Sequence, residues 1–222
     1  MKTKITLRET LIFLVSILPL FYLAYQWNNL PDTVPTHFNM KGEPDDFGSK
    51  NKFAVFIVTF NICFYLLMLV IPKIDPKKKF IQFMQTYNRI RLVMAVFMCA
   101  ISYLIINSAV SGTTQNTNSW IFLLTSLFLA ILGNYMGMIK PNYFIGIRTP
   151  WTLENETVWR KTHRLGGKLF FWIGIAGFAL AVILPMQKYT TVFIGLTITA
   201  VLISVVYSYV AYRNLNAETG VK

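Results

Sequence analysis

The sequence predicts an all-α integral membrane protein with six transmembrane helices and with its N- and C-termini in the cytoplasm. Of the 222 residues, 55% are hydrophobic and 14% are charged, whereas about 25% of the residues of a soluble domain are charged. Several apolar blocks approach the ~20 residues that a helix needs to cross a bilayer. The chain also has 18 Phe, 11 Tyr and 5 Trp, and this amount of apolar surface excludes intrinsic disorder.

Six stretches contain no Asp, Glu, Lys or Arg and are long enough to cross a membrane. They are residues 10–27, 53–72, 92–110, 119–139, 169–185 and 189–212. The first and fifth are short, so each either tilts little or extends into its flanking residues. The first 26 residues also resemble a signal peptide, but Leu23-Ala24-Tyr25 is a poor cleavage site and its use would leave five spans.

The distribution of charge predicts the orientation. With both termini in the cytoplasm, 17 of the 21 Lys and Arg and 5 of the 9 Asp and Glu lie on the cytoplasmic side. That face then carries the whole net charge of +12, in agreement with the positive-inside bias. The charge therefore favours membrane loops over direct nucleic-acid binding. The first cytoplasmic loop, residues 73–91, has a basic run that is expected to attract anionic lipid headgroups.

The external loop, residues 28–52, is punctuated by Pro and Gly and is expected to be ordered. Residues 33–38 can be extended, and residues 39–42 can turn the chain back. Side chains that suit a divalent cation gather in this loop, and the alternative is that they are solvated acidic turn residues. These candidate contact residues for a cation or a secreted ligand are His37, Asn39, Glu43, Asp45 and Asp46.

The second cytoplasmic loop, residues 140–168, is expected to contain a short helix at 153–165. Thr152 can cap this helix and Gly166-Gly167 can end it. Four apolar residues share one face of the helix, as is typical of a helix lying on the inner leaflet. They are Trp151, Val158, Trp159 and Leu165. The alternative is a solvated connector whose tryptophans belong to the interfacial aromatic belt.

The predicted spans contain packing residues and no recognisable catalytic chemistry. They have no ionisable group of the kind that proton-coupled transporters need, and His37 and His163 lie on opposite sides of the membrane without a partner at HExxH spacing. We therefore expect no enzyme, no cofactor and no resident metal. The pairs Gly133/Gly137 and Gly174/Gly177 predict close helix packing, and the amides of Asn61, Asn107 and Asn134 predict interhelical hydrogen bonds.

Two segments resemble parts of a known bacterial family. Residues 133–168, GNYMGMIKPNYFIGIRTPWTLENETVWRKTHRLGGK, resemble the signature region of the SdpI-like immunity proteins. Residues 30–45, LPDTVPTHFNMKGEPD, are similar to a small domain of unknown function that often precedes that region. The resemblance suggests an N-terminal two-span unit at 1–91 and an SdpI-like four-span unit at 92–222.

The resemblance implies a multi-span protein of the bacterial plasma membrane that protects its producer from a secreted antimicrobial peptide. It also implies signalling, in which the toxin-engaged protein holds an ArsR-type repressor at the membrane. The signature positions are Asn142, Tyr143, Gly146, Arg148, Thr149, Pro150, Trp151, Trp159 and His163. Two alternatives remain open: a transporter or channel for a peptide or small amphiphile, and, less favoured, a membrane enzyme.

Physical roles for the signature positions follow from their side chains. Gly146 and Pro150 are expected to fix the course of the backbone. Arg148 offers planar donors to a carboxylate, a carbonyl or a lipid phosphate. Trp151 and Trp159 are expected to anchor the loop at headgroup depth.

Overall fold

The computed structural model describes residues 6–38, 44–76, 78–112 and 117–219. Six helices are long and apolar enough to cross a membrane, so the prediction of six transmembrane helices is confirmed. The helices are α1 (Leu7–Tyr25), α2 (Lys50–Ile74), α3 (Met84–Ser111), α4 (Thr117–Met136), the short α5 (Pro150–Glu154), α6 (Glu156–Ile183) and α7 (Met186–Thr219). A 3-10 helix, η1 (Lys79–Phe83), leads into α3, and two strands, β1 (Thr33–Phe38) and β2 (Pro44–Ser49), join α1 to α2.

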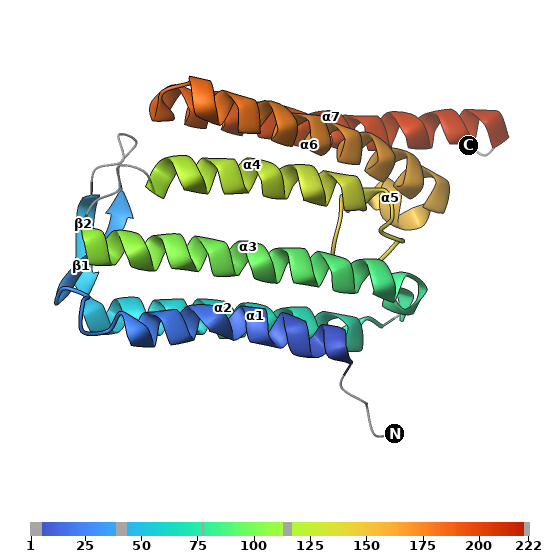
Figure 1. Ribbon diagram of the computed structural model, residues 1–222. Helices are drawn as coiled ribbons and strands as arrows, with labels where there is room; N and C mark the ends of the chain where they lie inside the picture. The colour runs from blue at the N-terminus through green and yellow to red at the C-terminus, as the bar shows by residue number, and fades with distance from the viewer. Residues whose placement is uncertain (1–5, 39–43, 77, 113–116, 220–222) are drawn as a thin grey trace.

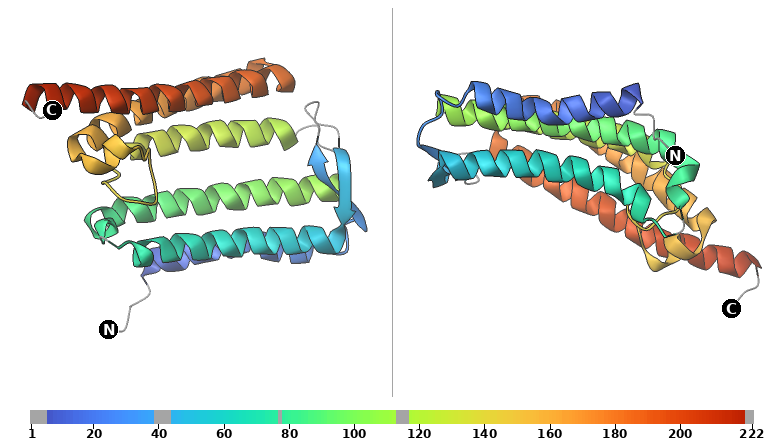
Figure 2. Two further views of the ribbon diagram at one scale, coloured as in Figure 1. Left: turned by 180° about the vertical axis from the view of Figure 1, so that it is seen from behind. Right: turned by 90° about the horizontal axis from the view of Figure 1, so that it is seen from below.

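The six long helices lie side by side in one bundle (Figure 1). α1 and α2 pack on α3, α3 packs on α4, and α4 packs on α6, which also contacts α7. The two strands lie across one end of the bundle, which we call the hairpin end, and α5 lies at the opposite end, which we call the loop end (Figure 2). α1 begins and α7 ends at the loop end, where α7 projects past the other helices.

The hairpin end is built on an antiparallel pair in which Val34 is the Cα partner of Gly48. Val34 is fully buried and packs in a cluster with Phe53 and Ile57 of α2 and Ile106 of α3. This burial holds the hairpin against the helices, because a two-stranded ribbon alone is marginally stable in water. The extended stretch predicted at 33–38 is confirmed, and the predicted turn at 39–42 lies outside the described residues.

The α4–α6 contact is made through glycines. A Cβ on Gly133 would lie 2.5 Å from the Phe171 nitrogen, and a Cβ on Gly174 would lie 2.4 Å from the Ala130 nitrogen. The two backbones therefore touch, as expected for small residues at a transmembrane interface. The packing prediction is right for Gly133, Gly174 and Gly177, and it is wrong for Gly137, whose Cβ would meet nothing within 4 Å.

Both boundaries predicted for the short helix at 153–165 are wrong. Thr149 caps α5, and the Oδ1 of Asn155 then accepts the amides of Thr157 at 2.8 Å and Val158 at 3.1 Å to start α6. α6 continues through Gly166-Gly167 to Ile183. Both glycines face other helices and loops, and neither has the positive φ that ends a helix.

An ion pair lies inside the bundle, near the loop end. Arg91 of α3 is 5% exposed and donates to both carboxylate oxygens of Glu9 in α1, at 2.6 and 2.8 Å. Tyr65 of α2 donates to the same carboxylate at 3.0 Å. The predicted spans at 10–27 and 92–110 excluded both charges, whereas the candidate spans of the structure, Leu7–Tyr25 and Lys79–Ser111, include them. The expectation that the spans contain no ionisable group is therefore wrong, and the bidentate pair is the arrangement that allows the two charges to be buried.

Two of the three intramembrane amides make the interhelical bonds that the sequence predicts. The Nδ2 of Asn61 donates to Ser102 at 2.9 Å, and the Oδ1 of Asn107 accepts from Tyr22 at 3.5 Å. Asn134 is exposed at the surface of α4, and no hydrogen-bond partner for it lies within the described residues.

Candidate functional site

The loop between α4 and α5 is folded around the side chain of Asn142, which is 2% exposed. Its Oδ1 accepts the backbone amides of Phe144 and Ile145, each at 2.8 Å. Its Nδ2 donates to the carbonyls of Lys140 at 2.9 Å and Ile145 at 3.1 Å. One amide side chain therefore satisfies four backbone groups, and Asp could not replace it because a carboxylate has no donors.

His163 of α6 is the buried centre of this loop, and Gly146 lies against it. Gly146 has a φ of 107°, and a Cβ on it would lie 2.3 Å from the Nε2 of His163. That Nε2 accepts the amide of Ile147 at 3.0 Å, and Nδ1 faces the carbonyl of Trp159 at 2.9 Å. The geometry assigns the neutral tautomer with its proton on Nδ1, because only that form can make both bonds.

Trp159 lies in the protein interior, so the expectation that it anchors the loop at headgroup depth is wrong. It is 1% exposed and its ring stacks on His163 with centroids 4.0 Å apart. Its Nε1 donates at 2.8 Å to the carbonyl of Ile139. This carbonyl lies just after the end of α4, where backbone acceptors lack a helical partner, and a buried indole N–H needs such an acceptor.

Thr149 links the loop to α7. Its Oγ1 lies 3.0 Å from the Oγ of Ser208, and its backbone amide donates to Thr152 at 2.9 Å. The Thr152 hydroxyl donates to the carbonyl of Ile147 at 2.9 Å. Pro150 follows as the first residue of α5, where a missing N–H costs nothing.

The remaining signature residues lie at the surface. Arg148 is exposed and its Nη1 donates to the carbonyl of Tyr143, whose side chain is 38% exposed. Trp151 is half-buried, with its ring 5.1 Å from that of Tyr209 in α7. The signature therefore divides into a frame around His163 and a face at the surface. The frame is formed by the buried residues Asn142, Thr149, Trp159 and His163 and by the exposed Gly146, which lies against His163. The face is formed by the exposed residues Tyr143, Arg148 and Pro150 and by the half-buried Trp151.

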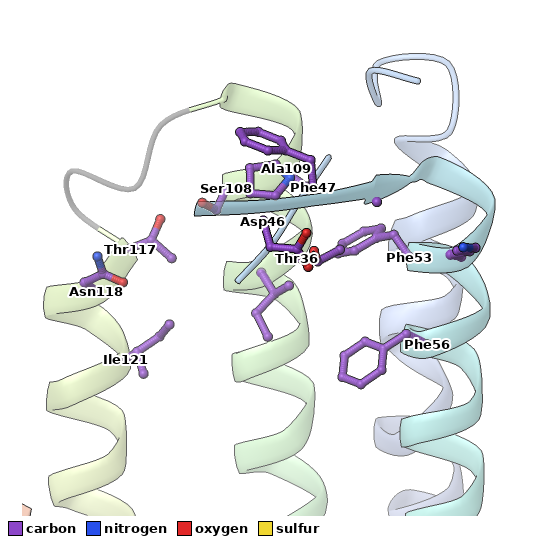
Figure 3. Close-up of a pocket in the computed structure, with 14 residues that line it drawn as sticks. Thr36, Asp46, Phe47, Phe53, Phe56, Ser108, Ala109, Thr117, Asn118 and Ile121 are labelled. Carbon is purple, nitrogen blue, oxygen red and sulfur yellow. Dashed lines mark hydrogen bonds between the residues drawn. The ribbon is translucent and has the colours of Figure 1, made fainter. Parts of the chain in front are cut away.

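A pocket of about 610 Å³ lies at the hairpin end, which we call the outer pocket (Figure 3). The hairpin, α2, α3 and α4 all contribute to its wall. Its polar residues include Asp46, Lys52 and Asn118, and Phe56 and Ile121 lie deeper between the helices. A cavity of this size with an apolar interior and a few polar groups is typical of a binding site.

Among the candidate contact residues of the external loop, Asp46 lines this pocket and also accepts from Thr36 at 2.9 Å. The Nδ1 of His37 lies 2.6 Å from the Oδ1 of Asp45. Asn39 and Glu43 lie outside the described residues. Within the described part of the chain, no three His, Cys, Asp or Glu side chains are placed to hold one metal ion.

The comparisons with known proteins match both distinctive regions. The SdpI/YfhL protein family matches residues 138–208, which include the whole loop frame and most of α7. The chain is 32% identical over 211 residues to "Immunity protein SdpI" of Bacillus subtilis (strain 168), and the match covers 93% of each chain. The chain belongs to the SdpI/YfhL protein family. The resemblance seen in residues 133–168 is thereby confirmed.

Two further matches cover smaller parts of the chain. A domain of unknown function (DUF1648) matches residues 14–62, which include the hairpin and parts of α1 and α2. An uncharacterized protein of Archaeoglobus fulgidus is 37% identical over 49 residues, which are 22% of this chain and 27% of that protein. No solved structure matches the chain.

Proposed function

We propose that this multi-pass membrane protein protects its cell against a secreted antimicrobial peptide, without catalysis, by taking part of that peptide into the outer pocket. The pocket is the observation that carries the proposal. It lies among α2, α3 and α4 at the hairpin end, and it combines an apolar interior with one acidic and one basic side chain, Asp46 and Lys52. An amphipathic peptide can bury an apolar side chain there and pair its own charge at the rim.

The proposal places the hairpin end outside the cell. The positive-inside bias supports this orientation, since the basic residues of the second cytoplasmic loop lie at the loop end with α5 and the start of α6. The 32%-identical relative is named an immunity protein. Protection from a peptide that arrives from outside needs a receptor surface on that side of the membrane.

The second part of the proposal is that the exposed face of the signature loop holds an ArsR-type repressor at the membrane. Tyr143, Arg148 and Trp151 lie at this surface. Aromatic and Arg side chains contribute most of the binding energy in many protein interfaces. The frame around His163 supports this face from beneath, through bonds of 2.8–3.1 Å such as those of Asn142.

The test is survival in mixed culture. A Bacillus subtilis strain that lacks its own SdpI would express this chain and be grown with wild-type cells of the same species. We expect it to outlive the empty-vector strain, and equal killing of the two would contradict the proposal. Ile121→Trp should fill the outer pocket and remove protection, while Val55→Trp, on the α2 surface outside the outer pocket, should keep it.

A transporter would also confer survival, so accumulation of the labelled peptide has to be measured in the same cells. A binding protein leaves the peptide at the cell surface whether or not the membrane is energised. Loss of protection together with rising internal peptide after an uncoupler is added would favour energy-dependent export instead.

A further inference from the structure

A second concave site, of about 260 Å³, lies between α4 and α6 at the loop end, and we call it the inner groove. It exists because Gly133 and Gly167 bring the two helices into backbone contact, with the Gly167 oxygen 2.7 Å from a Cβ placed on Gly133. A concave space remains above this contact. Gly137 leaves it open at its end, since a Cβ there would meet nothing within 4 Å.

The walls of the inner groove are basic. Arg164 and Lys168 are four residues apart on α6 and both line it, so they lie on one face of the helix. Both side chains are exposed, and neither has a carboxylate within ion-pair distance among the described residues. Asn134 lines the opposite wall on α4, and the described residues that line the groove include no acidic side chain.

The position along the helices places this site where hydrocarbon meets water. α4 has 20 residues and so rises about 30 Å, which is the thickness of the bilayer core. Asn134 lies two residues before its end at Met136. Further into the membrane along α6, Trp172 is 65% exposed and lines the same groove. Basic residues followed by an exposed tryptophan are typical of a helix at the lipid interface.

We propose that the inner groove binds the headgroup of an anionic phospholipid. Phosphate oxygens would accept hydrogen bonds from the Arg164 guanidinium and the Lys168 ammonium, and the Asn134 amide would donate to the glycerol or ester region. An acyl chain would then follow α6 past Phe171 and Trp172, both of which line the groove. Two cations and no carboxylate favour a lipid with net negative charge over a zwitterionic one, because the latter brings its own ammonium group.

The test is lipid retention by the purified full-length protein. Wild-type protein in detergent would be mixed with equal amounts of phosphatidylglycerol and phosphatidylcholine, and the retained lipid would be counted by native mass spectrometry. We expect a phosphatidylglycerol to be retained in preference to phosphatidylcholine. The double variant Arg164→Ala/Lys168→Ala should lose this preference by roughly tenfold or more. Arg160→Ala/Lys161→Ala removes two exposed charges from the same helix outside the groove and should keep it.

A third variant tests whether lipid binding depends on the shape of the inner groove or only on attraction between opposite charges. Gly137→Leu adds bulk to the groove at a position with open space and no positive φ, and it removes no charge. We expect it to lose the phosphatidylglycerol preference as well. Equal retention by the two double variants, full retention by Gly137→Leu, or displacement of the lipid by inorganic phosphate would each overturn the proposal.

Discussion

The two ends of the bundle differ in structure, although the same long helices run through both. At the hairpin end, α2, α3 and α4 stand apart around a pocket of about 610 Å³. At the loop end, the side chains of Asn142, His163 and Trp159 are 0–2% exposed, and each is hydrogen-bonded to backbone groups. The comparison teaches that the hairpin end leaves an open cavity between its helices, whereas in the signature loop of the loop end buried polar side chains hold one backbone conformation.

Gly146→Ala should have the largest effect on stability, because the added methyl group would clash with the buried centre of the signature loop. The new Cβ would lie 2.3 Å from the Nε2 of His163 and would also occupy a φ of 107°, which disfavours an L-residue by about 1–2 kcal/mol. We expect loss of folded protein, measured by detergent size-exclusion chromatography after heating. Gly112→Ala is the control, since its φ is 66° but nothing lies within 4 Å; equal loss from both variants would mean that the contact with His163 contributes nothing.

Asn142→Asp should destabilise the loop by an intermediate amount. It keeps the acceptors for Phe144 and Ile145 but loses the donors to the carbonyls of Lys140 and Ile145. A buried acceptor left without its donor costs about 1–3 kcal/mol. We expect faster trypsin cleavage after Arg148 in detergent-solubilised protein. Cleavage at the wild-type rate would contradict the role assigned to this amide.

Arg148→Ala should change stability little and function greatly. The side chain is exposed and its bond in the structure goes to the Tyr143 carbonyl, so the stability change should stay within about 0.5 kcal/mol. We expect normal membrane insertion, measured by carbonate extraction, together with loss of protection in the mixed-culture assay. Full protection by a normally expressed Arg148→Ala protein would show that this position on the exposed face is not needed.

His37→Ala should have the smallest effect on stability. Its pair with Asp45 is short at 2.6 Å, but the two side chains are 68% and 43% exposed, and exposed ion pairs contribute about 0–1 kcal/mol. We expect an unchanged thermal midpoint, measured by size-exclusion chromatography after heating. A clear drop would mean that the hairpin end is held by polar contacts in the way that the loop end is.

Much of the fold could be predicted from the sequence, because lipid as solvent forces apolar runs to become helices. The extended stretch at 33–38 was also predictable from its Pro and β-branched residues. The prediction of a helix at 153–165 is wrong because Thr152 caps no helix. Thr149 caps α5 and Asn155 caps α6. Pro150 preceded by Thr149 gave the better signal, since proline prefers the first position of a helix.

The sequence indicates the signature loop, which lies within the family match at 138–208, but it does not indicate the geometry of that loop. Within α6, Gly167 lies against Gly133, more than thirty residues earlier, whose oxygen is 2.6 Å from a Cβ placed on Gly167, and a tertiary contact of this kind has no local signal. The four-residue spacing of Trp159 and His163 is the one local signal for their stacked rings, because residues four apart lie on one helix face. The outer pocket brings together four segments, and no pattern within any one of them predicts a cavity.

The length of α7 affects how a soluble molecule can approach the loop end. Its 34 residues rise about 51 Å, while a bilayer core is about 30 Å thick. α7 projects past the other helices at the loop end, so its last turns, which include Arg213, extend beyond the bundle (Figure 1). A soluble molecule that approaches along the bundle axis from that side meets these turns before it reaches α5.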